Sequence, residues 1–221
     1  MNKAEHLKWN EGMARKYDID NFHTRTNIFI RQIENARIGA VVGAIAPKPG
    51  ERILEVGCGS GKVLENFENG SLHGIDISRE LLSKARKKFG RKVVLKYGDA
   101  EAIPFPSNYF DKICCTEVLE HLRNPGKAIS EMRRVGRPGS LAAITIPNEH
   151  MIDDAKAIAR KLGMGFLLKN VASEKNEWHI HYFDEKKLLG LAKGKMELLS
   201  LRGLPMGFLP LHYIAVFRIT K

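Results

Sequence analysis

The sequence predicts an α/β fold, in which helices on both faces cover a mostly parallel seven-stranded sheet that ends in an antiparallel C-terminal strand. Two observations lead to this prediction. Short apolar runs alternate with helical stretches through the middle of the chain, namely RILEVG, LHGIDIS, KVVLKYG, DKICCTE and LAAITIP. Two further strands, near 195–202 and 211–219, follow without a helix between them, which is typical of an antiparallel hairpin. The predicted hairpin loop is GLPMGFLP.

Apolar positions at helical spacing predict the elements between the strands. The first two helices precede the sheet, and Pro47 and Pro49 end the second of them. At 221 residues the chain has the size of one α/β domain. The predicted helices cover about 3–17, 25–46, 60–68, 78–89, 117–135, 149–162 and 184–191.

The composition is that of a soluble globular protein, with 43% hydrophobic and 28% charged residues. The apolar stretches are shorter than the ~18 residues of a membrane span, and the polar N-terminus lacks the apolar core of a signal peptide. Cys58, Cys114 and Cys115 form no CxxC pair. We therefore expect reduced thiols and a cytoplasmic location.

Basic residues outnumber acidic ones, 36 to 25, which gives a net charge of +11. Such a balance attracts polyanions, so a nucleic-acid partner is one interpretation. A solubilising surface is the other, because the densest cluster falls at the end of a predicted helix, where the helix dipole favours cations. That cluster consists of Lys84, Arg86, Lys87, Lys88, Arg91 and Lys92.

The segment EVGCGSGKV at 55–63 forms a glycine-rich loop directly after the first sheet strand. A triphosphate loop is excluded, because only three residues separate Gly57 from Gly61 and Lys62 is followed by Val63 instead of Ser or Thr. A dinucleotide loop is disfavoured, because Lys62 stands where its last glycine belongs. The remaining pattern is G-x-G-x-G with an acidic residue, Glu55, in the preceding strand.

Two aspartates follow the next two strands. Asp76 ends the second strand, 19 positions after Gly57, where a carboxylate can accept hydrogen bonds from both hydroxyls of a ribose. Asp99 follows the third strand in GDA, where it can accept a hydrogen bond from the amine of an adenine. Because the carboxyl ends of parallel strands meet at one edge, these residues predict a nucleoside-binding crevice.

These motifs resemble the class I S-adenosylmethionine-dependent methyltransferases, and within them the type 11 group, over roughly 51–147. The motifs are EVGCGSG, GIDIS, YGDAEAIPFPSNYFD and KICCTEVLEHL, whereas RVGRPGS matches the family's KPGG turn less well. The resemblance implies a Rossmann-like fold and S-adenosylmethionine as the cofactor. It also implies one methyltransferase domain (1–221) with an N-terminal helical cap (1–46), a cofactor-binding core (51–147) and a substrate-side insertion with the C-terminal hairpin (148–221).

The resemblance also assigns roles within the cofactor site. Gly57, Gly59 and Gly61 face the methionine portion and the sugar, Glu55 orders the loop and its waters, and Ile77 forms an apolar wall on the adenine. Thr116 and Glu117 border the reactive methyl group. A tyrosine of the entry helix, here Tyr17, covers the cofactor, although a surface tyrosine that packs on the core is an alternative. The implied cofactor-binding residues are Tyr17, Glu55, Gly57, Cys58, Gly59, Gly61, Asp76, Ile77, Asp99, Ala100, Thr116 and Glu117.

Glu117 and His121 are the candidate catalytic residues. Their i, i+4 spacing puts them on one face of a predicted helical turn, and His121 is a candidate general base. Local packing of His121 is the alternative. Some relatives, including quinone-biosynthesis O-methyltransferases, bind a divalent metal through an ExxEH motif and a later histidine. Here that set is Glu117, Glu120, His121 and either His179 or His181, and a metal-free site is the other interpretation.

The methyl acceptor is expected to be a small or lipid-like molecule that is methylated at oxygen. The Asn/Asp-Pro-Pro-aromatic signature of amino-group methylation is absent after the fourth strand, and the apolar segments GMGFLLKNV and LPMGFLP can line a hydrophobic pocket. Trp178, His179 and His181 are expected at its mouth. Two alternatives are an RNA or protein methyltransferase and a regulatory subunit that binds the cofactor without catalysis.

Overall fold

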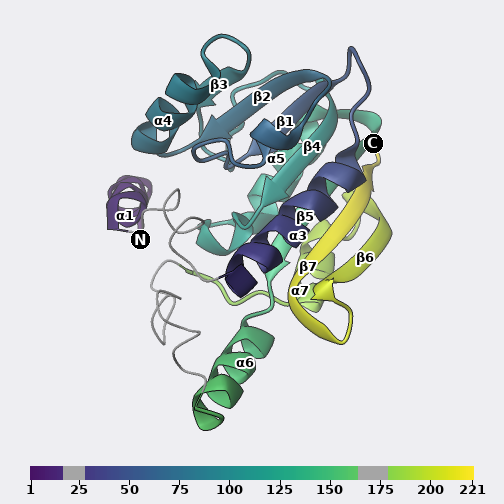
Figure 1. Cartoon of the computed structure of the whole chain (residues 1–221). Coiled ribbons are helices and arrows are strands. Elements are labelled where there is room, and N and C mark those ends of the chain that lie inside the picture. Colours follow the sequence, from purple (N-terminus) through teal and green to yellow (C-terminus); the bar gives the residue numbers. More distant parts are fainter. Residues whose placement is uncertain (17–27, 164–178) are drawn as a thin grey trace.

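A single sheet of seven strands forms the centre of the protein, with the order β3-β2-β1-β4-β5-β7-β6 (Figure 1). The computed structural model describes residues 1–16, 28–163 and 179–221. Strands β1 to β5 pair in parallel, and β7 runs antiparallel to both β5 and β6, so the predicted fold class is confirmed. The strands are β1 (Arg52–Val56), β2 (Ser71–Asp76), β3 (Val94–Tyr97), β4 (Phe110–Thr116), β5 (Gly136–Pro147), β6 (Met196–Met206) and β7 (Leu209–Ile219).

Helices lie on both faces of the sheet. In Figure 1, α3 crosses the front of the sheet and α5 lies behind it, while α1 lies beside α4. The adjacent residues Cys114 and Cys115 pack into different hydrophobic clusters, because successive strand side chains point to opposite faces. The helices in the described part are α1 (Lys3–Lys16), α3 (Ile28–Ile45), α4 (Arg79–Phe89), α5 (Pro125–Val135), α6 (Glu149–Lys161) and α7 (Glu185–Ala192), with the 3₁₀ turns η1 (Leu64–Asn66) and η2 (Leu119–His121).

The predicted helix over 117–135 is wrong, because the chain divides there into η2 and α5. Glu117 has a φ of 54°, a left-handed conformation in which a helix cannot begin. Pro125 then opens α5 with Asn124 as its N-cap, whose side chain accepts a hydrogen bond from the Lys127 N–H (3.0 Å). The residue before a proline is disfavoured in helical geometry, so α5 can begin only at the proline. Glu117 and His121 therefore do not share a helical turn.

Two further predicted boundaries are wrong. The helix over 60–68 is reduced to η1, since Gly61 has a φ of 82° and its N–H closes a tight turn on the Cys58 carbonyl (2.7 Å). The hairpin loop is also shorter than predicted. Pairing between β6 and β7 continues to Met206 and Leu209, which leaves only Gly207 and Phe208 in the turn.

The carboxylate of Glu11 fastens α1 to the beginning of α4. Ser78 caps α4 by accepting a hydrogen bond from the Leu81 N–H (3.2 Å), and its hydroxyl donates to Glu11 Oε2 (3.0 Å). The Arg79 N–H donates to Glu11 Oε1 (2.7 Å). A carboxylate at the positive end of a helix dipole is favourable, so this contact stabilises both the cap and the docking of α1.

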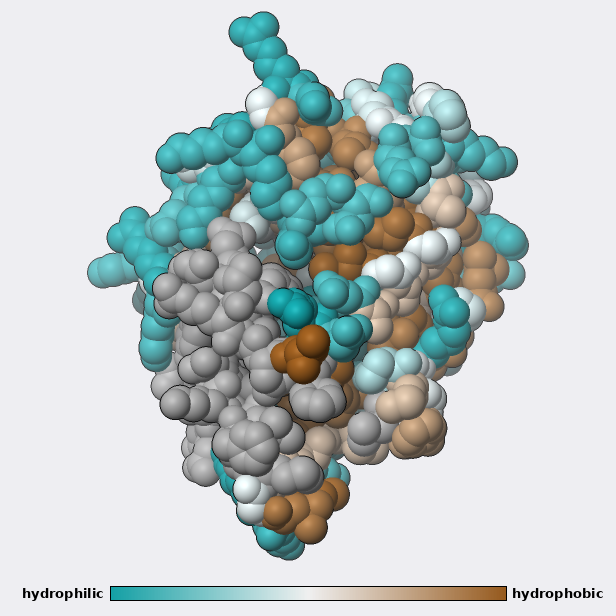
Figure 2. Space-filling model, in the orientation of Figure 1, coloured by the Kyte–Doolittle hydropathy of each residue, from teal (hydrophilic) through white to brown (hydrophobic). Residues whose placement is uncertain are grey.

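The described surface is mixed, with hydrophobic residues among polar ones (Figure 2). The lower tip in Figures 1 and 2 is the end of α6, where Ile158 and Leu162 are 57% and 66% exposed. Phe208 in the hairpin turn is 82% exposed. Among the described residues, no helix has both the length and the apolar character that crossing a bilayer requires.

Replacing Glu11 by alanine should loosen α1. The variant loses two hydrogen bonds at the beginning of α4, and we expect it to be less stable by about 1 kcal/mol, the usual cost of a lost cap. Amide hydrogen exchange over residues 3–16 should accelerate, as followed by mass spectrometry. Glu5→Ala, on the same helix, is the matched control, because within the described part of the chain the hydrogen bonds of the Glu5 side chain reach only Asn2 at the helix start. Equal exchange in the two variants contradicts the docking role of Glu11.

Candidate functional site

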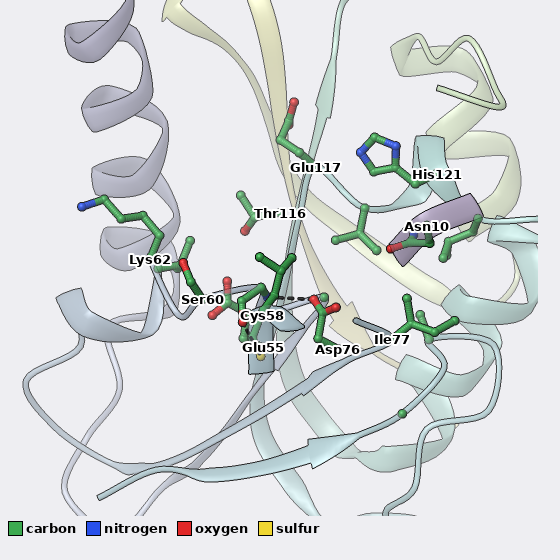
Figure 3. A pocket seen from close by; sticks show the side chains of 18 of the residues that line it. Asn10, Glu55, Cys58, Ser60, Lys62, Asp76, Ile77, Thr116, Glu117 and His121 are labelled. Atoms are coloured by element: carbon green, nitrogen blue, oxygen red, sulfur yellow. Dashed lines mark hydrogen bonds between the residues drawn. The ribbon is translucent and has the colours of Figure 1, made fainter. Parts of the chain in front are cut away.

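A cavity of about 260 Å³ opens at the carboxyl ends of β1, β2 and β4 (Figure 3). This edge is the point where the strand order reverses between β1 and β4, the usual ligand crevice of an open α/β sheet. In Figure 3, Asp76 lies on it at the end of β2, and Thr116, Glu117 and His121 lie on it at the end of β4 and in the turn that follows. The predicted site residues that line the cavity are Glu55, Gly57, Cys58, Gly59, Asp76, Ile77, Ala100, Thr116, Glu117 and His121.

The three glycines of the loop differ in what surrounds them, although all have positive φ (72°, 50° and 82°). A side chain on Gly57 would collide with Val118, and one on Gly61 would collide with Phe89 of α4. A Cβ added to Gly59 would not collide, since it would lie at an ordinary van der Waals distance, 3.8 Å, from the side chain of Leu81. Gly57 and Gly61 thus allow close packing of the loop, whereas Gly59 leaves space on the cavity side.

Asp76 holds the glycine loop against the start of α4. Its Oδ2 accepts a hydrogen bond from the Gly59 N–H (2.7 Å), and its Oδ1 accepts one from the Ser78 N–H (2.8 Å). Burial raises the pKa of Asp76, while these backbone donors act in the opposite direction. Each carboxylate oxygen retains a second lone pair, so the group can still accept hydrogen bonds from a ligand in the cavity.

Glu55 is a buried carboxyl group in the cavity wall, 2% exposed. Its Oε2 has no hydrogen-bond partner among the described residues. Burial raises its pKa well above the ordinary value, and the nearby Asp76 adds to that shift, although a backbone hydrogen bond at Leu64 opposes it. The structure therefore favours a neutral Glu55 beneath the glycine loop.

Two of the predicted cofactor residues that the structure describes, Gly61 and Asp99, do not line the cavity. Gly61 is turned toward Phe89, and the Asp99 carboxylate instead meets Lys3 Nζ (3.3 Å) and the Glu101 N–H (2.9 Å). The neighbours of Asp99, Gly98 and Ala100, line the cavity in its place. Tyr17 lies outside the described residues.

Glu117 is the centre of a network that joins four elements. Its Oε1 accepts a hydrogen bond from the Thr145 hydroxyl of β5 (2.8 Å) and lies 3.8 Å from Arg37 Nη1 of α3. Its Oε2 lies 3.0 Å from Nδ1 of His212 at the beginning of β7. Burial opposes ionisation of Glu117, but the charges of His212 and Arg37 and the hydrogen bonds from His212 and Thr145 prevail and lower its pKa well below the usual range. Glu117 is therefore a fixed anion in the cavity wall.

A second polar cluster lies at η2. Ligand atoms of Glu120, His121 and His179 all lie within 4.8 Å of one another. The Ile180 and His181 N–H groups donate to the Glu120 carbonyl (2.9 and 3.1 Å), which brings His179 to this turn. Both carboxylate oxygens of Glu120 are buried without a hydrogen-bond partner in the described part of the chain. Burial, reinforced by the charge of Glu117, raises its pKa well above the ordinary value.

The cluster differs from the predicted metal set in one member, Glu117, and contains His179 of the two later histidines. Glu117 belongs to the network with Arg37 and His212, so it does not join Glu120. His181 lies apart, with its Nε2 3.4 Å from the Arg123 carbonyl. His179 Nδ1 lies 2.5 Å from Glu149 Oε1, which is the arrangement that commonly orients a metal-binding imidazole.

Several cavity residues were missed by the sequence reasoning. Asn10 enters from α1, Arg37 and Ile38 from α3, and Ser60 and Lys62 from the glycine loop. Arg37 could have been predicted from the sequence, because it is a charged residue in the apolar second half of α3. Such residues are seldom buried without a partner. Its guanidinium forms an ion pair with Glu34 one turn earlier.

Comparison with known proteins finds a family that part of the chain resembles. Residues 54–144 match the type 11 family model described as a methyltransferase domain. An O-methyltransferase of Penicillium expansum is 32% identical over 139 residues, which cover 58% of this chain and 50% of that protein. A ubiquinone biosynthesis O-methyltransferase of Hahella chejuensis is 28% identical over 170 residues, which cover 72% and 68%. The chain spans about half the length of several curated relatives that it matches.

The fold is also found among solved structures. The crystal structure of an S-adenosylmethionine-dependent methyltransferase from Thermotoga maritima matches with a TM-score of 0.68 at 17% identity. The match covers 98% of this chain and 100% of that one. At this identity the likeness establishes the common fold, which extends beyond the residues that the family model matches.

The pH dependence of stability should reveal the neutral state of Glu55. A carboxyl group whose pKa is raised by folding contributes stability that is complete below its unfolded pKa, near 4.5, and is lost as the pH rises through its folded pKa. Glu55→Gln cannot ionise. The free energy of unfolding of this variant should therefore rise relative to that of the wild type as the pH increases above 4.5. Urea denaturation across pH 4.5 to 8 measures the difference. Parallel curves for the two proteins contradict the assignment.

Proposed function

We propose a function for the whole chain, starting from the match of residues 54–144 to the methyltransferase domain of the type 11 family. We propose that it transfers a methyl group from S-adenosylmethionine to an oxygen of a small or lipid-like acceptor. The observation that carries this proposal is the cavity at the switch point of the sheet, with Asp76 and the glycine loop on one side and Glu117 on the other.

The cofactor would lie across the strand ends that form the cavity. Asp76 would accept the ribose hydroxyls, Ile77 and Ala100 would contact the adenine, and the loop around Gly59 would face the methionine portion. Thr116 supports the placement of a polar ligand, because its buried hydroxyl has no partner among the described residues. The sulfonium already activates the methyl group, so the chain mainly has to align an acceptor and exclude water.

The same placement of the cofactor suggests which parts of the chain bind the cofactor and which bind the acceptor. Residues 51–147 would bind the cofactor, α1 would add Asn10 to its pocket, and residues 148–221 would serve the acceptor. Transfer to oxygen agrees with the O-methyltransferases among the relatives. The RNA or protein methyltransferase and the non-catalytic subunit are not favoured by these relatives. A cytoplasmic location is an inference from the sequence alone.

Labelled methyl transfer tests the function. The protein is incubated with methyl-labelled S-adenosylmethionine and with extracts separated into RNA, protein, lipid and small-molecule fractions. We expect label in the lipid or small-molecule fraction, and calorimetry should detect binding of S-adenosylmethionine and of its demethylated product. Label confined to RNA or protein contradicts the proposed acceptor class. Absence of cofactor binding contradicts the proposed function itself.

We further propose that Glu120, His121 and His179 bind a divalent cation beside the acceptor. One carboxylate and two imidazoles suit Zn²⁺ or Mn²⁺, and the two unpartnered oxygens of Glu120 fit a cationic ligand. Glu149 would orient His179 through its hydrogen bond to Nδ1 without touching the cation. A bound cation would polarise the acceptor hydroxyl. In this arrangement His121 acts as a ligand rather than as a base.

Asp76→Ala should weaken cofactor binding by about 1.5 to 3 kcal/mol, the scale of hydrogen bonds to a charged group. Calorimetric titration with S-adenosylmethionine measures the dissociation constant. Because Asp76 also holds the Gly59 and Ser78 N–H groups, Asp76→Asn serves as the control that keeps one side-chain oxygen in place. An unchanged dissociation constant in Asp76→Ala contradicts the ribose assignment.

Removing a metal ligand should abolish cation binding without affecting the cofactor site. In calorimetric titrations with Zn²⁺ or Mn²⁺, we expect no measurable binding to Glu120→Gln or His179→Ala. Glu149→Gln should bind about 10 to 100 times more weakly, as is usual when the partner of a metal-binding histidine is lost. His181→Ala is the matched control, since His181 lies outside the cluster. Equal binding by Glu120→Gln and the wild type excludes the site.

A further inference from the structure

His212 stands at the edge of the sheet where the cavity opens, although it is near the beginning of its own strand. Because β7 runs antiparallel to β5, His212 pairs with Pro147, the last residue of β5. Its side chain is 13% exposed and touches Glu117, which lines the cavity. The antiparallel strand therefore adds an imidazole to an edge that the parallel strands supply with carboxylates.

The order of the strands places His212 on the acceptor side. The residues proposed for the adenine and the ribose follow β3 and β2, the glycine loop follows β1, and Thr116 ends β4. Neighbouring strands lie about 4.8 Å apart, so β7 lies roughly 10 Å beyond β4, with β5 between them. A cofactor that runs from β3 to β4 leaves the edge at β5 and β7 for the second substrate.

The contact with Glu117 determines which nitrogen of His212 carries a proton. Glu117 is held as an anion by Thr145 and Arg37, and an anion can only accept a hydrogen bond, so Nδ1 of His212 must be the donor. In the neutral imidazole, Nε2 then has a free lone pair. Within the described residues no partner of Nε2 is found. A carboxylate, an imidazole and an open Nε2 form the arrangement that orients a general base in many hydrolases.

The charged groups around Glu117 and His212 support the arrangement in which Nδ1 of His212 donates a hydrogen bond to an ionised Glu117. Arg37 of α3 lies 3.8 Å from Glu117 and also forms an ion pair with Glu34, while Glu117 acts through its charge on Glu120 of η2. The residues beside His212 in the sheet, Pro147 of β5 and Leu204 of β6, are uncharged. Glu117 is thus the anion in direct contact with the imidazole among the described groups.

We propose that His212 is the general base that takes the proton of the acceptor hydroxyl, and that Glu117 positions it. This inference rests on the proposed methyl transfer to oxygen. The acceptor oxygen forms a bond to the methyl carbon, the bond from that carbon to sulfur breaks, and its electron pair stays on sulfur. The hydroxyl proton moves to Nε2 of His212, and Glu117 stabilises the resulting imidazolium.

The first test requires no acceptor. Nitrogen-15 NMR of histidine-labelled protein, assigned with His212→Asn, should find the hydrogen of neutral His212 on Nδ1. In Glu117→Gln, which can also donate from its amide, this single tautomer should give way to a mixture. A neutral wild-type His212 that carries its hydrogen on Nε2 overturns the proposal, whatever the enzyme methylates.

The second test uses the extract fraction that accepts label, as the acceptor probe. His212→Asn keeps a donor for Glu117 but cannot take a proton, so turnover should fall by about 100-fold or more, within the range attributed to general bases. The dissociation constant for S-adenosylmethionine should stay within about twofold, because His212 is placed away from the cofactor. If the acceptor hydroxyl is phenolic, the loss of turnover in His212→Asn should become smaller toward about pH 10, because a phenol ionises there without a base.

The rival base is His121, and the same assay separates the two. In the wild type the rate should fall at low pH, and this fall should disappear from the residual activity of His212→Asn but persist in the residual activity of His121→Asn. If the fall instead persists in His212→Asn and disappears in His121→Asn, the proton moves to His121 and the proposal is overturned. Failure of the wild type to methylate any fraction is a failure of the proposed function, whereas normal turnover by His212→Asn is a failure of this inference alone.

Discussion

The reversal of strand order between β1 and β4 is the constraint on which the site depends. The chain adds β2 and β3 on one side of β1 and then crosses to add β4 and β5 on the other, so the connections leave the two central strands in opposite directions. The loop after β1 must then turn within a few residues. The Gly57 and Cys58 N–H groups both donate to the Ile75 carbonyl at 2.9 Å, which ties this turn to β2 and keeps the crevice open.

Of the described carboxyl groups, Glu55, Asp76 and Glu117 line that crevice and Glu120 lies in the turn η2 beside it, and their partners determine the direction in which each pKa is shifted. Burial raises the pKa values of Glu55 and Glu120, which have oxygens without hydrogen-bond partners in the described part of the chain. Glu117 is as close to the crevice but has His212, Arg37 and Thr145 around it, and its pKa is lowered. One site thus combines carboxyl groups whose pKa values burial raises with a carboxylate, Glu117, that its cationic and hydrogen-bonding partners keep ionised.

The parts of this arrangement that depend on local sequence could be predicted. Strands buried on both faces appear as short apolar runs, and Asp76 could be found because it ends one of them before a helix cap. The network of Glu117 could not, since its partners Thr145 and His212 are 28 and 95 residues away in the chain. Those contacts hold Glu117 in a left-handed conformation that propensity alone disfavours, and the predicted helix failed at that residue. Asp99 could be located at a strand end, but its bond to Lys3 depends on where α1 docks.

The short turn η2 links two segments that are distant in the sequence. The carbonyl oxygen of His121 accepts a hydrogen bond from Nε2 of His6, 115 residues earlier, while the carbonyl oxygen of Glu120 receives the N–H groups of Ile180 and His181. A rotation of this one turn by a few tens of degrees would redirect both carbonyls at once. The N-terminal helix and the chain around residue 180 are therefore thermodynamically coupled, and any ligand that immobilises η2 also lowers the entropic cost of ordering both of these segments.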